Sequence, residues 1–216
     1  MRYGDVVGDL VRSYDDGAAY RDALAKDEWK LAERAAFADR VLAAGGGRLL
    51  EIGAGTGQDS LFFASRGLDV IATDLSPAMV ERCRAKGLDA RVMDFLGLDF
   101  PPGSFDAVFA FNCLLHVPNA DLPAVLAVIR GVLRPGGLFF VGVYGGDGGE
   151  GVWEPDQHVP KRFFSWRTDE QIQAFAGAVF EIVDFHLVNL GDFRWQSLTL
   201  RAGPTRRPPP IKDLFR

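Results

Sequence analysis

The sequence has few cysteines and no long apolar run. Its 216 residues include only two cysteines, Cys83 and Cys113, which is too few for a disulfide framework or a cysteine metal cluster, so we expect no metal. No apolar stretch approaches the ~20 residues that a membrane-spanning helix requires. Residues 1–17 contain acidic residues and glycines where a signal peptide would be apolar. We therefore expect a cytoplasmic protein with no membrane association.

Basic charge is also scarce. Lys and Arg number 24 against 29 Asp and Glu, which gives a formal net charge of −5. Proteins that bind nucleic acid usually carry a basic patch, so the balance argues against a nucleic-acid partner. The remaining composition, 48% hydrophobic and 25% charged, is that of an ordinary globular protein. The length suits one α/β domain, and we expect a monomer or a homodimer.

The spacing of apolar residues predicts helices followed by an α/β domain. Over 1–45, one helix would bury Leu31, Ala35, Ala38 and Leu42 on a single face. Short apolar runs then alternate with helical segments, which is typical of a doubly wound, Rossmann-like sheet with helices on both faces. The runs are RLLEIG at 48–53, DVIAT at 69–73, ARVMD at 90–94, FDAVFAFN at 105–112 and, after an RPGG turn, GLFFVGVY at 137–144.

The C-terminal part has a different pattern. Thr168 and Gln171 form a capping box, which predicts the start of a helix. The two strand-like runs that follow, at 179–188 and 194–202, have so short a link that only antiparallel pairing is possible. We therefore expect a seven-stranded sheet, mostly parallel, that ends in an antiparallel hairpin. The predicted divisions are a helical cap at 1–45, the main α/β domain at 46–202 and a basic, proline-rich tail at 203–216.

The stretch LLEIGAGTGQDS at 49–60 joins the first predicted strand to a helix through three glycines. Such a loop can hold a nucleoside triphosphate, a dinucleotide or a nucleoside without phosphates. A P-loop needs Lys and then Ser or Thr after its last glycine, whereas Gln58 and Asp59 follow Gly57 here, so a triphosphate is excluded. A dinucleotide fingerprint needs its third glycine at position 58 and therefore matches less well.

Three acidic residues mark successive predicted strands. Glu51 lies within the first strand, Asp74 ends the second and Asp94 ends the third. The carboxyl ends of parallel strands meet at one crevice, where open α/β sheets bind their ligands. Carboxylates there repel a pyrophosphate, but they accept ribose hydroxyls and attract a cation. The sequence therefore predicts a positively charged nucleoside, and S-adenosylmethionine fits this description.

Taken together, the motifs resemble the class I S-adenosylmethionine-dependent methyltransferases, in particular the group that acts mostly on small molecules. LLEIGAGTG looks like the first motif of that family and VIATDLSPAMVERCRAKG like its second. VMDFLGLDFPPGSFDAVFAFNCLLHVP resembles the third and fourth motifs, and VLRPGGLFFVGVY resembles the element after them. The resemblance is strong over 48–143. It implies S-adenosyl-L-methionine as the cofactor and S-adenosyl-L-homocysteine as the product.

The same resemblance implies a set of cofactor contacts. Gly53, Ala54 and Gly55 would face the methionine part, with Glu51 organising the loop or the amino group. Asp74 would hold the ribose. The further implied contacts are Gln58, Leu75 beside the adenine, Asp94 at the adenine amino group, Phe95 near the ring, Asn112 beside the methionine part, and Tyr14 and Tyr20 from the N-terminal helices.

Catalysis of methyl transfer depends largely on holding the acceptor in line with the methyl group. An oxygen or nitrogen acceptor also loses a proton, and His116 after the fourth predicted strand is the candidate general base, with a wall of the cofactor site as its alternative role. The glycine-rich segment 144–167 is predicted to be a substrate lid over a small-molecule acceptor. Its candidate substrate contacts are Tyr144, Trp153, Arg162 and Phe163.

Three other functions stay open at this point. Within the same class, the acceptor would be a protein or an RNA. In a different class, the glycine loop would serve a nicotinamide or flavin oxidoreductase. A non-catalytic sensor would bind the cofactor without transferring the methyl group. Methylation of exocyclic base amines is disfavoured, because Asn112 is followed by Cys-Leu-Leu and not by Pro-Pro and an aromatic residue.

Overall fold

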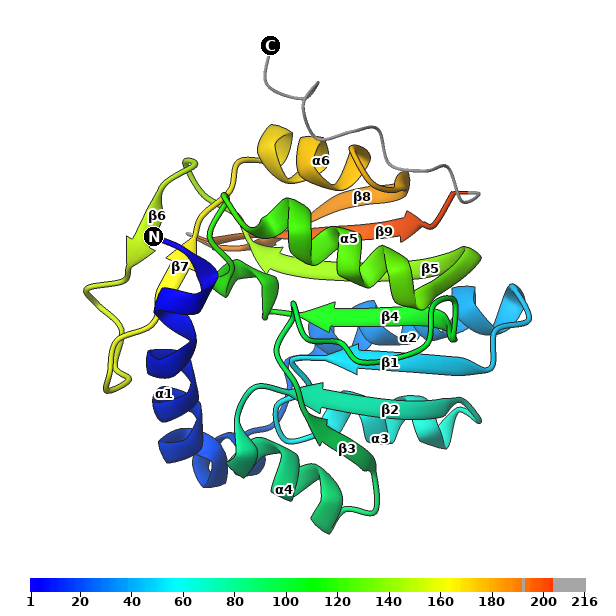
Figure 1. Ribbon diagram of the computed structural model, residues 1–216, viewed down its shortest axis with the longest axis horizontal. Helices are drawn as coiled ribbons and strands as arrows, with labels where there is room; N and C mark the ends of the chain where they lie inside the picture. Colours follow the sequence, from blue (N-terminus) through cyan, green and yellow to red (C-terminus); the bar gives the residue numbers. More distant parts are fainter. Residues whose placement is uncertain (192, 204–216) are drawn as a thin grey trace.

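A seven-stranded sheet forms the centre of the computed structural model, which describes residues 1–191 and 193–203. The strand order is β3-β2-β1-β4-β5-β9-β8. β1 to β5 run parallel, whereas β9 is antiparallel to both β5 and β8. The predicted fold class is confirmed (Figure 1). The strands of this sheet are β1 (Arg48–Ile52), β2 (Asp69–Asp74), β3 (Asp89–Val92), β4 (Phe105–Phe111), β5 (Leu133–Tyr144), β8 (Glu181–Leu190) and β9 (Phe193–Arg201).

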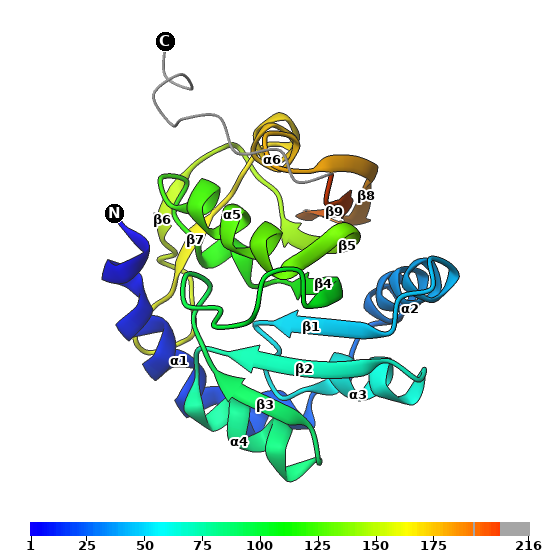
Figure 2. The ribbon, with the colours of Figure 1, turned by 45° about the vertical axis from the view of Figure 1, so that its right-hand side comes forward.

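Helices cover both faces of the sheet and one of its edges. α2 and α3 pack on one face, and α5 and α6 pack on the other. α1 lies across the carboxyl ends of the parallel strands, beside a small antiparallel sheet formed by β6 and β7 (Figures 1 and 2). The helices are α1 (Tyr3–Ala23), α2 (Glu28–Ala43), α3 (Gln58–Ser65), α4 (Pro77–Ala85), α5 (Leu122–Val132), α6 (Asp169–Gly177) and the 3-10 helix η1 (Leu114–His116); the small sheet pairs β6 (Glu150–Val152) with β7 (Phe163–Ser165).

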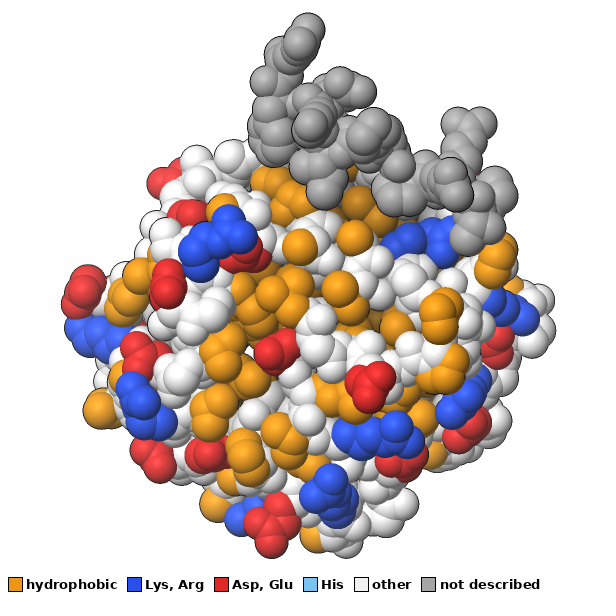
Figure 3. Space-filling view, viewed as in Figure 1, with side chains coloured by type: hydrophobic (Ala, Val, Ile, Leu, Met, Phe, Trp, Pro, Cys, Tyr) orange, Lys and Arg blue, Asp and Glu red, His pale blue; other side chains and the backbone are white. Residues whose placement is uncertain are grey.

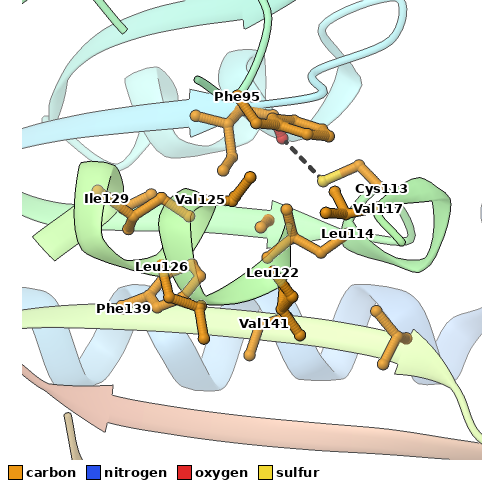
Figure 4. Close-up of a cluster of buried hydrophobic side chains, with 14 of the residues drawn as sticks. Phe95, Cys113, Leu114, Val117, Leu122, Val125, Leu126, Ile129, Phe139 and Val141 are labelled. Atoms are coloured by element: carbon orange, nitrogen blue, oxygen red, sulfur yellow. Dashed lines mark hydrogen bonds between the residues drawn. The ribbon is translucent and has the colours of Figure 1, made fainter. Parts of the chain in front are cut away.

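The central strands are buried on both faces. Neighbouring side chains of a strand point in opposite directions, so Leu49 contacts the layer of α2 and α3 while Leu50 contacts the layer of α5. This explains why the strands are continuous apolar runs. Figure 4 shows Leu122 and Leu126 of α5 directed towards the sheet, where Phe139 lies. Each such buried side chain contributes roughly 1.5–3 kcal/mol through removal of apolar surface from water.

The predicted buried face of α2 was only partly right. Ala38 is buried as predicted, but Leu31 and Leu42 are 37% and 36% exposed, and α2 instead buries Phe37 and Val41 beside Ala38. The ring of Phe37 packs against aromatic rings of α3, β4 and β5, with ring centroids 5.4–6.5 Å apart. A phenyl ring removes more apolar area from water than a leucine, so the face that carries it turns inward.

The limits of two strands also differ from the prediction. β3 ends at Val92, so Asp94 lies beyond it. β5 begins at Leu133 and includes the RPGG segment that was predicted as a turn, because Gly136 and Gly137 exchange backbone hydrogen bonds with Ala202 at 2.7 and 2.9 Å. This pairing partner is distant in the sequence, and a local turn pattern does not reveal it.

The predicted divisions of the chain are only partly reflected in the structure. Only α1 crosses the end of the sheet, because α2 packs on its face as part of the main domain. The segment 144–167 contains β6 and β7, two short strands that were not predicted. Of the predicted tail at 203–216, only Gly203 lies within the described residues. No helix in the described part of the chain has the length and apolar character needed to cross a bilayer.

Candidate functional site

The glycine loop connects β1 to α3 at the carboxyl edge of the sheet. Gly53 and Gly55 have φ values of +64° and +56°, a left-handed conformation that favours glycine. A Cβ atom at Gly53 would lie 2.5 Å from Cβ of Cys113, whereas at Gly55 it would meet no atom within 4 Å. Packing therefore requires glycine at position 53, while position 55 borders open space.

That space belongs to a cavity of about 250 Å³ between the loop, the strand ends and α1, which we name the first cavity. Most residues predicted to contact the cofactor line it. They are Tyr14, Glu51, Gly53, Ala54, Gly55, Gln58, Asp74, Leu75, Phe95 and Asn112. Two of the predicted contacts do not belong to this lining, Asp94 and Tyr20.

Asp74 lies at the end of β2 with both carboxylate oxygens directed at backbone N–H groups. Oδ2 accepts from Gly55 at 2.8 Å, and Oδ1 accepts from Ser76 at 2.9 Å. Burial raises the pKa of Asp74 to about 6. Each oxygen still has a lone pair for a further donor, so the carboxylate can accept the two hydroxyls of a ribose.

Glu51 contributes a second buried acid to the first cavity. Its side chain accepts a hydrogen bond from the hydroxyl of Ser60. Burial and the neighbouring Asp59 raise the pKa of Glu51. Asp59 is itself paired with Lys26 at 2.5 Å and with Arg34 at 2.8 Å, so both cations form their ion pairs with Asp59 and not with Glu51. Neither Glu51 nor Asp74 has an ion-pair partner among the described residues, and a cationic ligand would offset both.

Asp94 was predicted to line the crevice and does not. Its Oδ1 accepts from the backbone N–H groups of Leu96 and Gly97, at 2.8 and 2.7 Å, and so shapes the turn after β3. The next residue, Phe95, does reach the first cavity, and its ring stacks on that of Tyr3 with a centroid separation of 5.8 Å. The apolar end of the cavity is therefore formed by rings.

Asn112 adopts a left-handed conformation, with φ +53°, directly after β4. Its Oδ1 accepts from the indole N–H of Trp195 at 2.7 Å. Asparagine tolerates this backbone conformation better than most residues. The geometry places Asn112 at the border between the first cavity and a second one.

The second cavity lies between α1, η1 and the β6–β7 sheet. It shares part of its wall with the first cavity, namely Tyr14, Arg21, Lys30, Asn112 and His116. Three residues predicted to contact substrate line it, Tyr144, Trp153 and Arg162. The fourth, Phe163, is only 3% exposed and does not belong to its lining, although its neighbour Phe164 does.

A chain of hydrogen bonds connects the walls of the second cavity. Arg162 donates to the Tyr14 hydroxyl at 3.0 Å, and that hydroxyl is 2.5 Å from Nε2 of His116. Nδ1 of His116 lies 2.7 Å from the carbonyl oxygen of Phe163. Because a carbonyl only accepts, Nδ1 carries the proton of a neutral ring and Nε2 accepts from Tyr14. Burial lowers the pKa of His116 to about 3, which keeps the ring neutral at physiological pH.

Arg162 owes its position to a buried carboxylate. Asp156 accepts from Nε and Nη2 of Arg162 at 2.8 and 2.9 Å, in a bidentate pair. Hydrogen bonds from Arg162 and His158 hold the pKa of Asp156 below its usual range, despite burial. Such a pair has fixed geometry and keeps the guanidinium of Arg162 aimed at Tyr14.

The comparisons with known proteins agree with this geometry. The family model described as "Methyltransferase domain" matches residues 49–137. This match covers less than half of the 216 residues and agrees with the resemblance of the chain to S-adenosylmethionine-dependent methyltransferases. The matched segment 49–137 includes the glycine loop, Glu51, Asp74 and His116, and it excludes α1 and the β6–β7 sheet.

Two curated relatives match part of the chain. A sterol 24-C-methyltransferase of Yarrowia lipolytica is 33% identical over 140 residues, which cover 61% of this chain and 34% of that protein. A ubiquinone biosynthesis O-methyltransferase of Xanthomonas campestris is 36% identical over 104 residues, which cover 44% of this chain and 42% of that protein. The matches thus span less than half the length of either relative.

One solved structure resembles most of the chain, including parts outside the segment 49–137. It is the Burkholderia thailandensis 1,6-didemethyltoxoflavin-N1-methyltransferase, crystallised with 1,6-didemethyltoxoflavin and S-adenosylhomocysteine. The identity is 26%, the TM-score is 0.67, and the match covers 92% of this chain and 87% of that one. A methyltransferase of Methanosarcina mazei has the same fold, with a TM-score of 0.66 at 17% identity, over 72% of this chain and 92% of that one.

Several residues that line the site were not predicted. The clearest is Arg21 of α1, which lies seven positions after Tyr14 and lines the first cavity together with Tyr3 and Leu10 of the same helix. Spacings of 3, 4 and 7 place side chains on the same face of a helix, so the position of Tyr14 already indicated this face. Other cavity residues that sequence reasoning missed are Lys26, Lys30, Asp59 and Cys113.

Proposed function

We propose that this protein transfers the methyl group of S-adenosylmethionine to an oxygen or nitrogen of a small molecule. The observation that carries the proposal is the junction of two cavities with different chemistry. The first is bordered by the glycine loop and by two buried acids without ion-pair partners in the described chain. The second is lined mainly by aromatic rings, and the two share Tyr14, Asn112 and His116.

In the first cavity, the residues fit the cofactor from end to end. Asp74 has free lone pairs for the ribose hydroxyls, and Phe95 and Leu75 offer apolar surface to the adenine. Glu51, which lines the same cavity, would meet the ammonium group, and the open space at Gly55 would let the ligand approach the backbone closely. When bound, the cofactor supplies a methyl carbon that its sulfonium already activates.

At the junction, Tyr14 and His116 would orient the acceptor. The Tyr14 hydroxyl is fixed between Arg162 and His116, so its oxygen is aimed at a constant point. Nε2 of His116 is already engaged by Tyr14, and a pKa of about 3 makes it a weak proton acceptor. These observations favour positioning over general-base catalysis as the role of His116.

The second cavity has a volume of about 380 Å³, which favours a small acceptor over a protein or an RNA. Its walls come from α1 and from the 144–167 segment, so that segment would act as the predicted lid. On the face drawn in Figure 3, described acidic and basic side chains are interspersed. The dinucleotide alternative has no support in the family match, and buried acids beside Gly55 disfavour a diphosphate.

Calorimetric titration tests the proposal. S-adenosylhomocysteine should bind, and NAD should not. The variant Asp74→Ala should raise the Kd of S-adenosylhomocysteine at least tenfold, because it removes charge-assisted hydrogen bonds worth about 1.5–3 kcal/mol. Asp69→Ala is the matched control, since this exposed aspartate begins the same strand far from the cavity. Binding of NAD alone, or an unchanged Kd in Asp74→Ala, would refute the proposal.

A further inference from the structure

The second cavity combines aromatic and cationic walls. Its aromatic side chains are Tyr14, Tyr144, Trp153, Phe164 and Trp166, and its cations are Arg21, Lys30 and Arg162. No aspartate or glutamate of the described chain belongs to its lining. This is the opposite of the first cavity, where Glu51 and Asp74 face the ligand.

Two of the three cations are already neutralised. Arg162 forms the bidentate pair with Asp156 and gives its remaining Nη1 to the Tyr14 hydroxyl. Lys30 pairs with Asp27 at 2.7 Å. Neither side chain adds a net charge to the cavity.

Arg21 is different, because no carboxylate of the described chain lies within ion-pair distance of it. Its Nε is buried and has no hydrogen-bond partner among the described residues. Nη2 lies 3.4 Å from Nε2 of His158, and Nδ1 of that histidine is turned to Asp156 at 2.9 Å, so His158 is a neutral acceptor for Arg21. The guanidinium lies 4.8 Å above the ring of Tyr14. A partly buried cation without a counter-charge is costly, and an anionic ligand would remove that cost.

The aromatic wall is continuous. The rings of Phe164 and Trp166 are stacked, with centroids 5.0 Å apart and planes at 8°. Trp153 meets Phe164 edge-on at 5.6 Å. Flat ring surfaces of this kind bind a planar ligand by stacking.

We propose that the methyl acceptor is a planar aromatic or heteroaromatic anion, whose ring lies against Trp153, Phe164 and Trp166 and whose ionised oxygen or nitrogen faces Arg21. The inference rests on the proposed methyltransferase function. Arg21 borders both cavities, so the ionised atom would lie at the junction where the methyl carbon arrives.

An ionised acceptor also explains why His116, the histidine at the site, is only a weak base. Its lone pair forms the bond to the methyl carbon while the bond from that carbon to the sulfonium sulfur breaks, and no proton is released. The negative charge of the acceptor and the positive charge of the sulfonium cancel. A histidine with a pKa of about 3 is sufficient for such a reaction, because it needs only to hold Tyr14 in place.

The probe for this inference is 4-nitrophenol, whose absorbance reports its ionisation directly. It would be titrated with pH in the presence of the full chain saturated with S-adenosylhomocysteine, and 4-nitroanisole would serve as the neutral analogue. We expect the bound phenol to ionise at least one pH unit below the free phenol, and the phenolate to bind at least tenfold more tightly than 4-nitroanisole. Arg21→Met should abolish both effects, whereas Arg21→Lys should retain most of the shift.

Arg12→Met is the matched control, because Arg12 lies on the same helix, is exposed and pairs with Asp9. Equal binding of the phenolate and 4-nitroanisole, or no binding of the phenolate at millimolar concentration, would overturn the inference. So would an Arg21→Met variant that loses affinity for S-adenosylhomocysteine and keeps the shift, since Arg21 would then serve the cofactor carboxylate. If the wild-type chain binds no S-adenosylhomocysteine, the proposed function fails, and the same titration of the free protein still decides the anion site.

Discussion

The hydroxyl of Tyr14 donates to Nε2 of His116 at 2.5 Å, although 102 positions separate the two residues in the sequence. The bond joins α1 to η1, which follows the fourth strand of the sheet. Arg162 from the 144–167 segment donates to the same hydroxyl. One phenolic oxygen therefore links three parts of the chain around the junction of the two cavities.

Removing this oxygen should impair catalysis more than cofactor binding. In Tyr14→Phe, Nε2 of His116 and Nη1 of Arg162 lose a partner in a buried place, which costs about 1–3 kcal/mol of folding free energy. We expect a ten- to hundredfold lower kcat and a Kd for S-adenosylhomocysteine within threefold of the wild type. Product formation and calorimetry measure these values. Tyr20→Phe is the control, since Tyr20 is 71% exposed on the same helix and should behave as the wild type.

Alanine substitutions at two glycines of the loop should have different effects, one on stability and the other on ligand binding. Both have positive φ, which costs an alanine about 1–2 kcal/mol. Gly53→Ala adds a clash with Cys113 and should lower the free energy of unfolding well beyond that amount. Gly55→Ala meets no protein atom, so it should remain folded but bind S-adenosylhomocysteine at least tenfold more weakly. Urea denaturation and calorimetry distinguish the two, and equal loss of stability in both variants would contradict the expectation.

Binding of S-adenosylhomocysteine should weaken in mild acid. Burial raises the pKa of Asp74 to about 6, and only the ionised carboxylate has full capacity to accept the ribose hydroxyls. The contribution of Asp74 to the affinity is therefore present above pH 6 and is lost as the pH falls through that value. We expect the Kd to rise about tenfold per pH unit below pH 6, because one protonation then opposes binding. Calorimetry between pH 5 and 7.5 measures this slope.

In the variant Asp74→Asn, the Kd of S-adenosylhomocysteine should no longer change with pH around pH 6. Any remaining dependence at higher pH would come from Glu51, whose pKa is also raised by burial and by Asp59. A wild-type Kd that stays constant from pH 5 to 7 would show that the Asp74 carboxyl does not meet the ligand.

Local patterns were enough to predict the sheet and to name many residues that line the first cavity. Strand and helix periodicity, the glycine loop and the acid at the end of β2 are features of neighbouring residues, and Asp74 and Gly55 are joined by a hydrogen bond in the structure. The prediction for Asp94 was wrong because β3 ends two residues before it, and element ends are set by pairing that a single sequence does not show. Tyr20 was misplaced for a related reason, since only one face of α1 meets the sheet.

The second cavity was harder to predict, because its parts are far apart in the sequence. Tyr14, His116 and Arg162 were each named, but for separate roles, and nothing local indicates that their polar atoms meet. Arg167 shows the opposite case. It belongs to the segment 144–167 that was predicted to be a lid, yet it is 1% exposed and donates to the backbone carbonyls of Leu114 and Val117. Tertiary contacts decide whether a cationic side chain is bound by groups of the protein or remains available to a ligand.

The docking of α1 has a consequence for how two ligands would influence each other. Asp15 and Asp22 fasten this helix to α4, on the side of the first cavity, through Ser76 and Lys86. The same helix presents Tyr14 and Arg21 to the second cavity. A ligand in either cavity would therefore contact this shared helix. We expect the two binding free energies to be coupled, and thermodynamic linkage requires each ligand to change the affinity of the other by the same factor.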